Sequence, residues 1–435
     1  MSELPPKPPA RPEQASLWHR LRLARKDFLR AQPARLYGAW MAQQSALFYQ
    51  SYLVNDPTIV AQIPESDEAQ FPKSQIVARG LRPLLGRSVF VTSGAEWARA
   101  RALIDPAFAQ GRLRESFPAM AAASKAMLAR LDTGGTVEIE AHMSHATADV
   151  MMRTLFSLPI TDASARGVYE AFQAYQRAQP LLSPLSLLRF PGLGAQKGKV
   201  EARRIRDLLD ELIARRRATL AAGNAPNDLA TQLMTARDDA GQGFTDTEMA
   251  DQVAIFFLAG HETSASALAW AFYLLATHPG AQERVAAERQ ALGSGSLSFA
   301  QLRGLPFTRN VVRETLRLYP PVPMMLRDVA RPQRWRDRAI RPGALAILAP
   351  WYLHRHTKLW DNPDGFDPDR WASEGPKGAY IPFSKGPRVC TGAGFAMMEA
   401  VLMVSDLVSA FELRPVGAGP GPVSPITIRA QAGLT

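Results

Sequence analysis

The stretch FSKGPRVCTG, residues 383–392, holds the only cysteine of the 435-residue chain. Gly386 and Pro387 favour a tight turn ahead of Cys390, and the glycines after it let the backbone approach another group closely. The residues that follow, GFAMMEAVLMVSDLVSAFEL, are apolar almost throughout and predict a buried helix. Free N–H groups at the start of this helix, together with Arg388, would stabilise a thiolate at Cys390. Such a thiolate is either a nucleophile or a metal ligand.

The composition narrows this choice. A single cysteine excludes an intrachain disulfide, a four-cysteine zinc site and a cysteine-ligated iron–sulfur cluster. A nucleophile would need a histidine base, yet none of the seven histidines lies in a cysteine-protease or redox motif. A lone cysteine is often a small buried hydrophobe, but this setting favours a metal ligand. Haem iron can take a cysteine thiolate as its sole protein ligand.

At this point the chain resembles a known family. FSKGPRVCTG fits the haem-binding pattern Phe-x-x-Gly-x-Arg-x-Cys-x-Gly of the cytochromes P-450 at all five fixed positions. The resemblance implies a mainly α fold with a minor β region, in which a long central helix crosses the haem. It makes Cys390 the axial thiolate ligand of haem b (iron protoporphyrin IX). It also implies that Phe383 packs near the sulfur, that Gly386 permits the turn and that Arg388 pairs with a haem propionate.

Two more stretches of this kind carry an expected structural role. In ETLR, Glu314 and Arg317 lie one turn apart on a helix, which on its own suggests an ordinary surface ion pair of little worth. In the family this Glu-x-x-Arg joins an arginine further along the chain, here Arg370 in FDPDRW. The resemblance implies a buried network of these three residues that holds the Cys390 loop in place.

The run DQVAIFFLAGHETSASALAWAFYLLATHP, residues 251–279, predicts the long central helix. Thr245 and Glu248 have capping-box spacing ahead of it, and His278-Pro279 ends it. Within the run, AGHETS places a glycine and a carboxylate where both are costly, which by itself indicates a helix kink facing water.

In the family the central helix crosses the haem at this position. Ala259 and Gly260 would therefore contact the cofactor. The acid–alcohol pair Glu262 and Thr263 would be catalytic, managing protons at the oxygen-binding site. Glu262 would connect this site to solvent.

Haem propionates are expected to have further partners. EWARAR gives Trp97 and Arg101 one turn apart, on their own a cation–π pair. The resemblance makes them a Trp-x-x-x-Arg motif whose indole N–H and guanidinium meet the propionates. Arg327, in MMLRDVA, stands where the family often has another propionate partner.

The resemblance implies an enzyme that activates O2 and hydroxylates or epoxidises a hydrophobic small molecule. The expected pocket is largely apolar and contains adaptable methionines, so we expect a fatty acyl, terpenoid, steroid or aromatic substrate. The expected pocket residues are Phe90, Phe256, Ala259, Val322, Met324 and Met325.

Electrons are expected from separate redox partners, a ferredoxin with its ferredoxin reductase or a flavodoxin-type donor. The net charge is +11, and Arg99, Lys385 and Arg388 would attract an acidic ferredoxin. No helix-turn-helix, zinc-finger or RNP-type pattern accompanies this charge, so no nucleic acid partner is expected.

The chain is expected to begin with a disordered proline-rich tail, residues 1–14, followed by a single cytochrome P-450 catalytic domain, residues 15–435. The start is polar and the central helix is interrupted by His261 and Glu262, so we expect a cytoplasmic enzyme without a membrane anchor. The apolar, proline-broken segment 179–195 is a candidate lip of the substrate entrance.

Two other functions fit the cysteine motif. One is a haem-thiolate enzyme that uses or rearranges a peroxide in place of activating O2. The other is a non-catalytic haem-binding sensor or carrier. The intact acid–alcohol pair in AGHETS argues against both.

Overall fold

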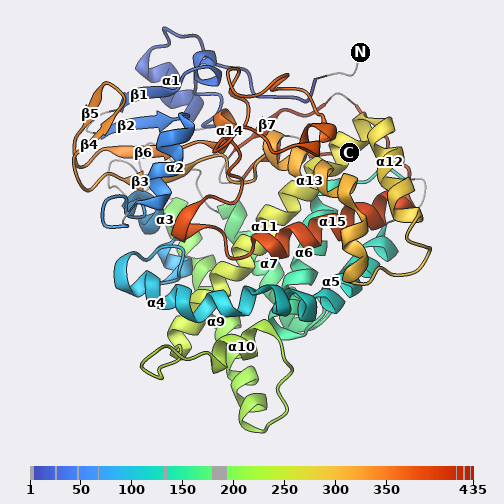
Figure 1. The fold of residues 1–435 in the computed structure, drawn as a ribbon. Coiled ribbons are helices and arrows are strands. Elements are labelled where there is room, and N and C mark those ends of the chain that lie inside the picture. Colours follow the sequence, from blue (N-terminus) through green and yellow to red (C-terminus); the bar gives the residue numbers. More distant parts are fainter. Residues whose placement is uncertain are drawn as a thin grey trace.

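The computed structural model describes residues 4–435 apart from 25–26, 47–48, 67, 132–134, 179–193, 418, 425–426 and 432. Its architecture is mainly α with a minor β region, as predicted (Figure 1). The strands of the main sheet gather on one side of the molecule, whereas most of the long helices fill the other. The helices are α1 (Leu17–Ala24), α2 (Pro57–Glu65), α3 (Gln75–Leu85), α4 (Gly94–Ile104), α5 (Gln110–Arg130), α6 (Ile139–Phe156), α7 (Ala163–Ala178), α9 (Gly194–Ala221), α10 (Leu229–Thr235), α11 (Asp246–Thr277), α12 (Pro279–Gln290), α13 (Pro306–Leu318), α14 (Pro350–Leu353) and α15 (Ala393–Ala410). Short 3-10 turns are η1 (Ala34–Tyr37), η2 (Asp105–Phe108), η3 (Ala300–Gly304), η4 (Pro368–Ala372) and η5 (Gly386–Arg388).

The predicted long central helix is α11, which runs through the middle of the molecule (Figure 1). Its capping box is confirmed, because Glu248 N donates to Thr245 Oγ1 (3.2 Å) and Thr245 N donates to Glu248 Oε2 (2.9 Å). With 32 residues it is about 48 Å long at about 1.5 Å per residue. Helices α6, α9, α13 and α15 pack around it and leave most of its side chains buried.

The main sheet has the order β1-β2-β6-β3. Strands β1 (Met41–Ala46) and β2 (Tyr49–Val54) form an antiparallel pair, and β2 runs parallel to β6 (Leu345–Leu348). Strand β3 (Met325–Asp328) is antiparallel to β6, with Arg327 opposite Ala346. Two small hairpins complete the β structure: β4 (Gln333–Trp335) with β5 (Arg338–Ile340), and β7 (Pro422–Val423) with β8 (Arg429–Ala430).

The described part of the segment expected to be a disordered tail, residues 4–14, instead packs on the rest of the chain. Arg11 is buried and its Nε donates to the carbonyl of Ala31 (2.8 Å). The hydroxyl of Tyr319 donates to the carbonyl of Pro6 (2.8 Å). The composition suggested disorder because prolines remove backbone donors, but Arg11 and Tyr319 supply donors that tie the segment to the domain.

Among the described helices, α15 alone is long and apolar enough to cross a membrane by length and composition, and 61% of it is buried inside the fold. It is the buried helix predicted to follow Cys390. Most of the expected entrance lip, residues 179–195, lies outside the described residues.

Candidate active site

Cys390 lies between η5 and α15, in a loop whose shape depends on glycine. Cys390 N donates to the carbonyl of Phe383 (2.9 Å), which closes the loop. Gly386 has φ +70°, and a Cβ there would lie 2.5 Å from the carbonyl oxygen of Pro64 in α2. Both the left-handed backbone and the close approach to α2 therefore require glycine, as the motif predicted.

The environment of the Cys390 thiol favours a metal ligand over a free nucleophile. Solvent reaches the side chain, but the surrounding protein desolvates the sulfur and raises the pKa of the thiol. The Gly392 N–H and the Arg101 charge oppose this shift only in part. A thiol of this kind stays protonated near neutral pH unless a bound metal cation removes its proton.

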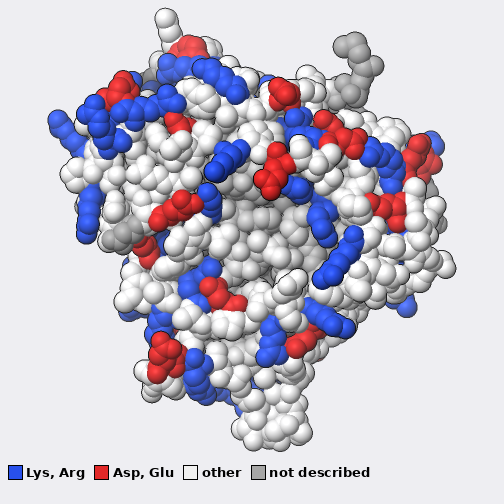
Figure 2. Space-filling model, viewed as in Figure 1, with Lys and Arg blue, Asp and Glu red and all other residues white. Residues whose placement is uncertain are grey.

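The middle of α11 is open although the helix is otherwise buried. Ala259 is exposed and Thr263 is half-buried, with Thr263 Oγ1 donating to the Ala259 carbonyl (2.6 Å). Gly260 allows α11 to pack closely against α6, because a Cβ at this position would lie 2.4 Å from Sδ of Met151 in α6. The exposed turn borders a recess, and Figure 2 shows a hollow at the centre of the face where Figure 1 places α11 and the segment leading into α15.

Glu262 does not turn toward Thr263. It is 9% exposed, and its carboxylate accepts hydrogen bonds from Thr427 Oγ1 (2.7 Å), Arg429 Nη2 (2.9 Å) and Gln176 Nε2 (3.1 Å). It therefore ties α11 to α7 and to the C-terminal hairpin. In the described part of the chain, no hydrogen bond joins Glu262 to Thr263.

A second carboxyl group, missed by the sequence reasoning, lies on the other side of Thr263. Ser264 Oγ donates to Glu399 Oε2 of α15 (2.6 Å), and Glu399 is fully buried. Burial raises the pKa of Glu399 to about 8, so this carboxyl group is protonated at neutral pH. Glu399 and Asp406 are the two acids in the apolar run of α15, and an acid in such a run was the available signal.

Trp97, Arg101 and Arg388 meet beside the Cys390 loop. The Arg388 guanidinium lies over the Trp97 ring, 4.5 Å from its centroid, and Arg101 Nη1 donates to the Val389 carbonyl (2.8 Å). Arg101 also pairs with the Asp105 carboxylate. Arg388 pairs with Glu68, so a protein carboxylate stands where the resemblance implied a propionate. The structure brings all three predicted residues together.

Arg327 is 5% exposed on β3, and its guanidinium donates only to the Leu326 carbonyl (3.1 Å) among the described residues. Burial lowers its pKa. Lys73 forms an isolated antiparallel bridge with Arg327. Lys73 lies in the loop FPKSQ, and no motif of the sequence marks it. Its position next to Arg327 follows from the tertiary pairing of this loop with β3.

Glu314, Arg317 and Arg370 form a buried cluster of the predicted composition. Arg317 makes two 2.8 Å contacts with the Glu314 carboxylate, and Arg370 Nε reaches it at 3.3 Å. Arg317 Nη1 also donates to the His354 carbonyl (2.9 Å), and His354 Nε2 accepts from Ile381 N (2.9 Å). The cluster is thus connected to the segment that enters the Cys390 loop.

Apolar side chains are exposed where the expected pocket lies. Phe90 and Val322 are 36% and 38% exposed, and Met324 is half-buried against the main core. Met325 packs instead against the cluster around the sheet. Phe256 lies on the same face of α11 as Thr263, seven residues before it. It is buried, with its ring 5.5 Å from that of Phe108.

These residues fit haem b. A soft sulfur ligand, an open turn of a buried helix, exposed apolar side chains and several cations together suit a flat apolar group that carries carboxylates. Of these cations, Arg327 is buried and has no carboxylate partner among the described residues. Cys390 would hold the iron, while Trp97, Arg101, Arg388 and Arg327 lie on the cationic side.

The three basic residues expected to attract a ferredoxin already have carboxylate partners. Arg99 pairs with Asp238 (2.8 Å) and Glu248 (3.0 Å), and Lys385 pairs with Glu65 (2.7 Å). Arg388 pairs with Glu68, as described above. These contacts reduce the positive field that the sequence alone suggested.

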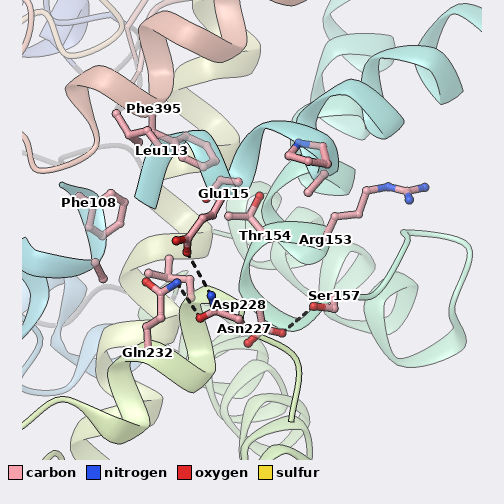
Figure 3. A pocket seen from close by; sticks show the side chains of 15 residues that line it. Phe108, Leu113, Glu115, Arg153, Thr154, Ser157, Asn227, Asp228, Gln232 and Phe395 are labelled. Carbon is pink, nitrogen blue, oxygen red and sulfur yellow. Dashed lines mark hydrogen bonds between the residues drawn. The ribbon is translucent and has the colours of Figure 1, made fainter. Parts of the chain in front are cut away.

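A separate cavity of about 210 Å³ lies between α5, α6 and α10, with Phe395 of α15 at one end (Figure 3). Several of its polar groups hydrogen-bond one another. Asn227 Nδ2 donates to Glu115 Oε2 (3.1 Å), and Ser157 Oγ donates to Asp228 Oδ2 (2.8 Å). We therefore assign no ligand to this cavity.

Comparisons with known proteins agree with this geometry. Residues 30–428 match the family described as Cytochrome P450. Cyclooctat-9-en-7-ol 5-monooxygenase of Streptomyces melanosporofaciens is 33% identical over 378 residues, which cover 84% of this chain and 81% of the relative. Cyclooctatin synthase of the same organism is 31% identical, covering 88% and 84%. Human cytochrome P450 4X1 is 30% identical, covering 82% and 74%.

A solved structure of retinoic acid bound cyanobacterial CYP120A1 superposes with a TM-score of 0.80 at 22% identity, covering 91% of this chain and 90% of that one. This likeness shows the fold. The family match extends over nearly the whole described chain and includes the Cys390 loop, α11 and the Glu314 cluster. The chain belongs to the cytochrome P450 family.

Proposed function

We propose that this cytochrome P450 monooxygenase holds haem b through the Cys390 thiolate and inserts one oxygen atom of O2 into an apolar, ring-containing hydrocarbon or alcohol. The observation that carries the proposal is the open turn of α11 at Ala259 and Thr263 in an otherwise buried helix. Exposed Phe90 and Val322 and the half-buried Met324 favour a hydrophobic substrate. The names of the two Streptomyces relatives support a cyclic alkenol or a close derivative.

Bound haem would supply the oxygen chemistry and accept electrons, assisted by electron donation from the thiolate. The chain supplies position and protons. Thr263 keeps its hydroxyl proton on the Ala259 carbonyl and leaves oxygen lone pairs directed away from the helix backbone. The apolar side chains exclude water and orient one C–H bond of the substrate.

Two acids next to Thr263 are candidates to replace a proton given up there, and neither hydrogen-bonds Thr263 in the described structure. Glu399 is neutral at pH 7 and hydrogen-bonds Ser264, the next residue along α11. Glu262 is held by Arg429, Thr427 and Gln176, and the partly exposed Arg429 side chain leads from it to the surface. We assign the proton relay to Thr263 with Glu262 as the acid linked to solvent.

We further propose that electrons come from a separate ferredoxin and its reductase or from a flavodoxin-type donor. Arg114 supports an acidic donor, because it is exposed on α5 next to Leu113, which packs against Gly394 in the first turn of α15. No described carboxylate forms an ion pair with Arg114. We place the enzyme in the cytoplasm as one catalytic domain, residues 15–435, supported by the family match over 30–428 and the burial of α15.

The proposed function is tested by turnover with O2 labelled with a heavy oxygen isotope, a ferredoxin with its reductase, and a panel of cyclic terpenoid alcohols, hydrocarbons and fatty acids. We expect one labelled oxygen atom in a hydroxylated or epoxidised product of an apolar cyclic substrate. Product formation from hydrogen peroxide alone, with none from O2 and reductase, would instead establish the peroxide-using alternative. A bound ligand that stays unoxidised under both conditions would indicate a sensor or carrier.

A further inference from the structure

The described part of the proline-rich start of the chain, residues 4–11, contacts the residue that leads into the expected substrate pocket. The hydroxyl of Tyr319 donates to the carbonyl of Pro6 (2.8 Å). Tyr319 ends α13 and is followed directly by residues 320–324, which we call the pocket loop. This loop contains two of the expected pocket residues, Val322 and Met324. The start of the chain is therefore hydrogen-bonded to the residue that begins one wall of the pocket.

The pocket loop depends on other parts of the chain for its backbone hydrogen bonds. Its sequence is PPVPM, and its three prolines have no N–H group to donate. Its carbonyls accept from residues that are distant in sequence. Ile428 N donates to the Pro321 carbonyl (3.1 Å), and Trp351 N donates to the Pro323 carbonyl (3.3 Å). The position of the loop is thus set by groups outside it.

Tyr319 anchors the beginning of the pocket loop. It is fully buried, its ring stacks on that of Trp270 in α11 with centroids 3.9 Å apart, and the Arg355 guanidinium lies 5.4 Å from its centroid. A buried phenol needs an acceptor for its proton. Burial raises the pKa of Tyr319, so the hydroxyl keeps this proton and donates it to the Pro6 carbonyl.

Residues 4–11 are held next to Tyr319 by contacts of their own. Lys7 forms an ion pair with Asp364, and its ammonium lies 5.1 Å from the centroid of the Tyr37 ring. Asp364 Oδ1 is also 3.5 Å from Nε of Arg355, the cation that contacts the Tyr319 ring. The segment is therefore fixed to the same group of residues that surrounds Tyr319.

From this arrangement we infer that residues 4–11 form a strap that positions the pocket loop through the hydrogen bond between Tyr319 and Pro6. Tyr319 is then a positioning residue for the substrate, although it does not itself line the recess. The strap contributes to substrate selection because Val322 and Met324 follow Tyr319 by only a few residues. This inference rests on the proposed function, to which it adds a determinant of the shape of the pocket.

The test measures amide hydrogen exchange in the full-length protein, by mass spectrometry of peptides that contain Trp351 and Ile428. The N–H groups of these two residues donate to the pocket loop, so their exchange reports its position. Tyr319→Phe removes the hydrogen bond to Pro6 and keeps the ring, and Lys7→Met weakens the attachment of the strap. A hydrogen bond of this kind is worth about 2- to 10-fold in an equilibrium constant. We expect both amides to exchange faster by about this factor in each variant.

Two control variants make the result specific. Tyr380→Phe removes the same kind of bond, from a tyrosine hydroxyl to the Arg313 carbonyl (3.1 Å), in another part of α13. Lys377→Met removes an exposed lysine elsewhere on the surface. Neither control should change exchange at Trp351 or Ile428.

A double variant tests whether the two substitutions act through the same strap. Exchange in Lys7→Met combined with Tyr319→Phe should be no faster than in the faster single variant, because one lost contact already releases the loop. If Tyr319→Phe does not fold, Lys7→Met against Lys377→Met carries the comparison.

A second measurement asks whether the strap affects the pocket itself. It compares spectral binding of imidazole and of clotrimazole, a bulky triaryl imidazole, to the haem-loaded wild type and Tyr319→Phe. Both compounds ligate haem iron, but only clotrimazole is large enough to fill the recess. We expect Tyr319→Phe to weaken clotrimazole binding by about 2- to 10-fold and to leave imidazole binding unchanged.

Unchanged exchange at both amides in Tyr319→Phe and Lys7→Met overturns the inference. Clotrimazole binding that changes no more than imidazole binding overturns it as well. Because hydrogen exchange requires neither haem nor turnover, an inactive protein with the expected exchange rates would contradict the proposed function alone.

Discussion

Gly386 shows how closely the Cys390 loop depends on single residues. Its φ of +70° suits glycine alone, and its missing side chain leaves room for the Pro64 carbonyl of α2. The turn it forms sets the path of the chain from Phe383 to Cys390. Gly386 therefore helps to position Cys390 through its backbone conformation alone.

Gly386→Ala should destabilise the protein and lower its haem content. Left-handed backbone costs an alanine about 1–2 kcal/mol, and the clash with Pro64 adds to this cost. Gly343→Ala is the matched control, because Gly343 has φ +86° but a Cβ there would touch nothing within 4 Å. Thermal unfolding and the haem-to-protein ratio check the prediction. Equal losses in the two variants would show that the contact with α2 is unimportant.

Thr263→Ala should leave the fold and haem content intact but divert electrons from product to hydrogen peroxide. Proton transfer by a positioned side chain contributes about 100-fold or more to rate, so the yield of product per electron should fall at least tenfold, roughly. Thr277→Ala is the control, since Thr277 Oγ1 makes the same kind of bond to the Tyr273 carbonyl (3.0 Å) at the end of the same helix. Unchanged coupling in Thr263→Ala would remove this residue from the relay.

At the scale of elements, the Glu314 carboxylate connects α13 to η4. It accepts from Arg317, Arg370, Trp371 Nε1 (3.0 Å) and Asp367 N (3.0 Å). One buried anion accepts from all these donors. The cluster also contacts His354, whose Nε2 accepts from Ile381 N in the segment that leads to Cys390. Loss of the anion leaves the buried Arg317 guanidinium and the partly buried Arg370 guanidinium without this counter-charge.

Glu314→Gln should therefore cost about 3–5 kcal/mol of unfolding free energy and reduce haem retention. Glu283→Gln, on the exposed side of α12, is the control and should change stability by less than about 0.5 kcal/mol. Urea unfolding of both variants gives the comparison. A loss below about 1 kcal/mol for Glu314→Gln would mean that the cluster does not hold the loop.

The sequence predicted those elements whose residues form local patterns. The Cys390 loop, the capping box of α11 and the Glu314–Arg317 pair each have a fixed spacing along the chain, and the structure contains all three. Lys73 and Glu399 have no such spacing. Their surroundings arise from contacts between β3 and the loop before α3, and between α11 and α15, which no local pattern encodes.

The direction of the Glu262 side chain was unpredictable for the same reason. Its partners Gln176, Thr427 and Arg429 are far away in sequence. The ordered N-terminal segment is a further case, because its polar, proline-rich composition indicates disorder unless distant groups such as Tyr319 supply partners.

For the whole molecule, buried titratable groups predict the pH dependence of stability. Burial lowers the pKa of His261 and of His354 to about 3, from the ordinary 6.5. The unfolded chain binds more protons between these values, so stability rises with pH up to about 6.5. Glu399 makes stability depend on pH in the opposite direction. Its pKa is raised to about 8 from 4.5, so between these values the folded state binds more protons than the unfolded chain. The contribution of Glu399 to stability therefore falls as the pH rises through this range.

We therefore expect the unfolding free energy to rise from about pH 5 to 6.5 and to fall from there to about pH 8, by up to about 1.4 kcal/mol per pH unit for each group. Glu399→Gln keeps a neutral polar group and should remove the fall above pH 6.5. Urea unfolding of the wild-type protein and of Glu399→Gln at several pH values checks the prediction. A fall of the same size in Glu399→Gln would assign it to other groups.

The central claim, that Cys390 ligates haem as a thiolate, is tested most directly by the absorption spectrum of the reduced, carbon-monoxide-bound protein. The account predicts a strongly red-shifted Soret band in the wild-type protein and its loss in Cys390→Ser. A band typical of histidine or neutral-thiol ligation in the wild-type protein, or the red-shifted band persisting in Cys390→Ser, would contradict it.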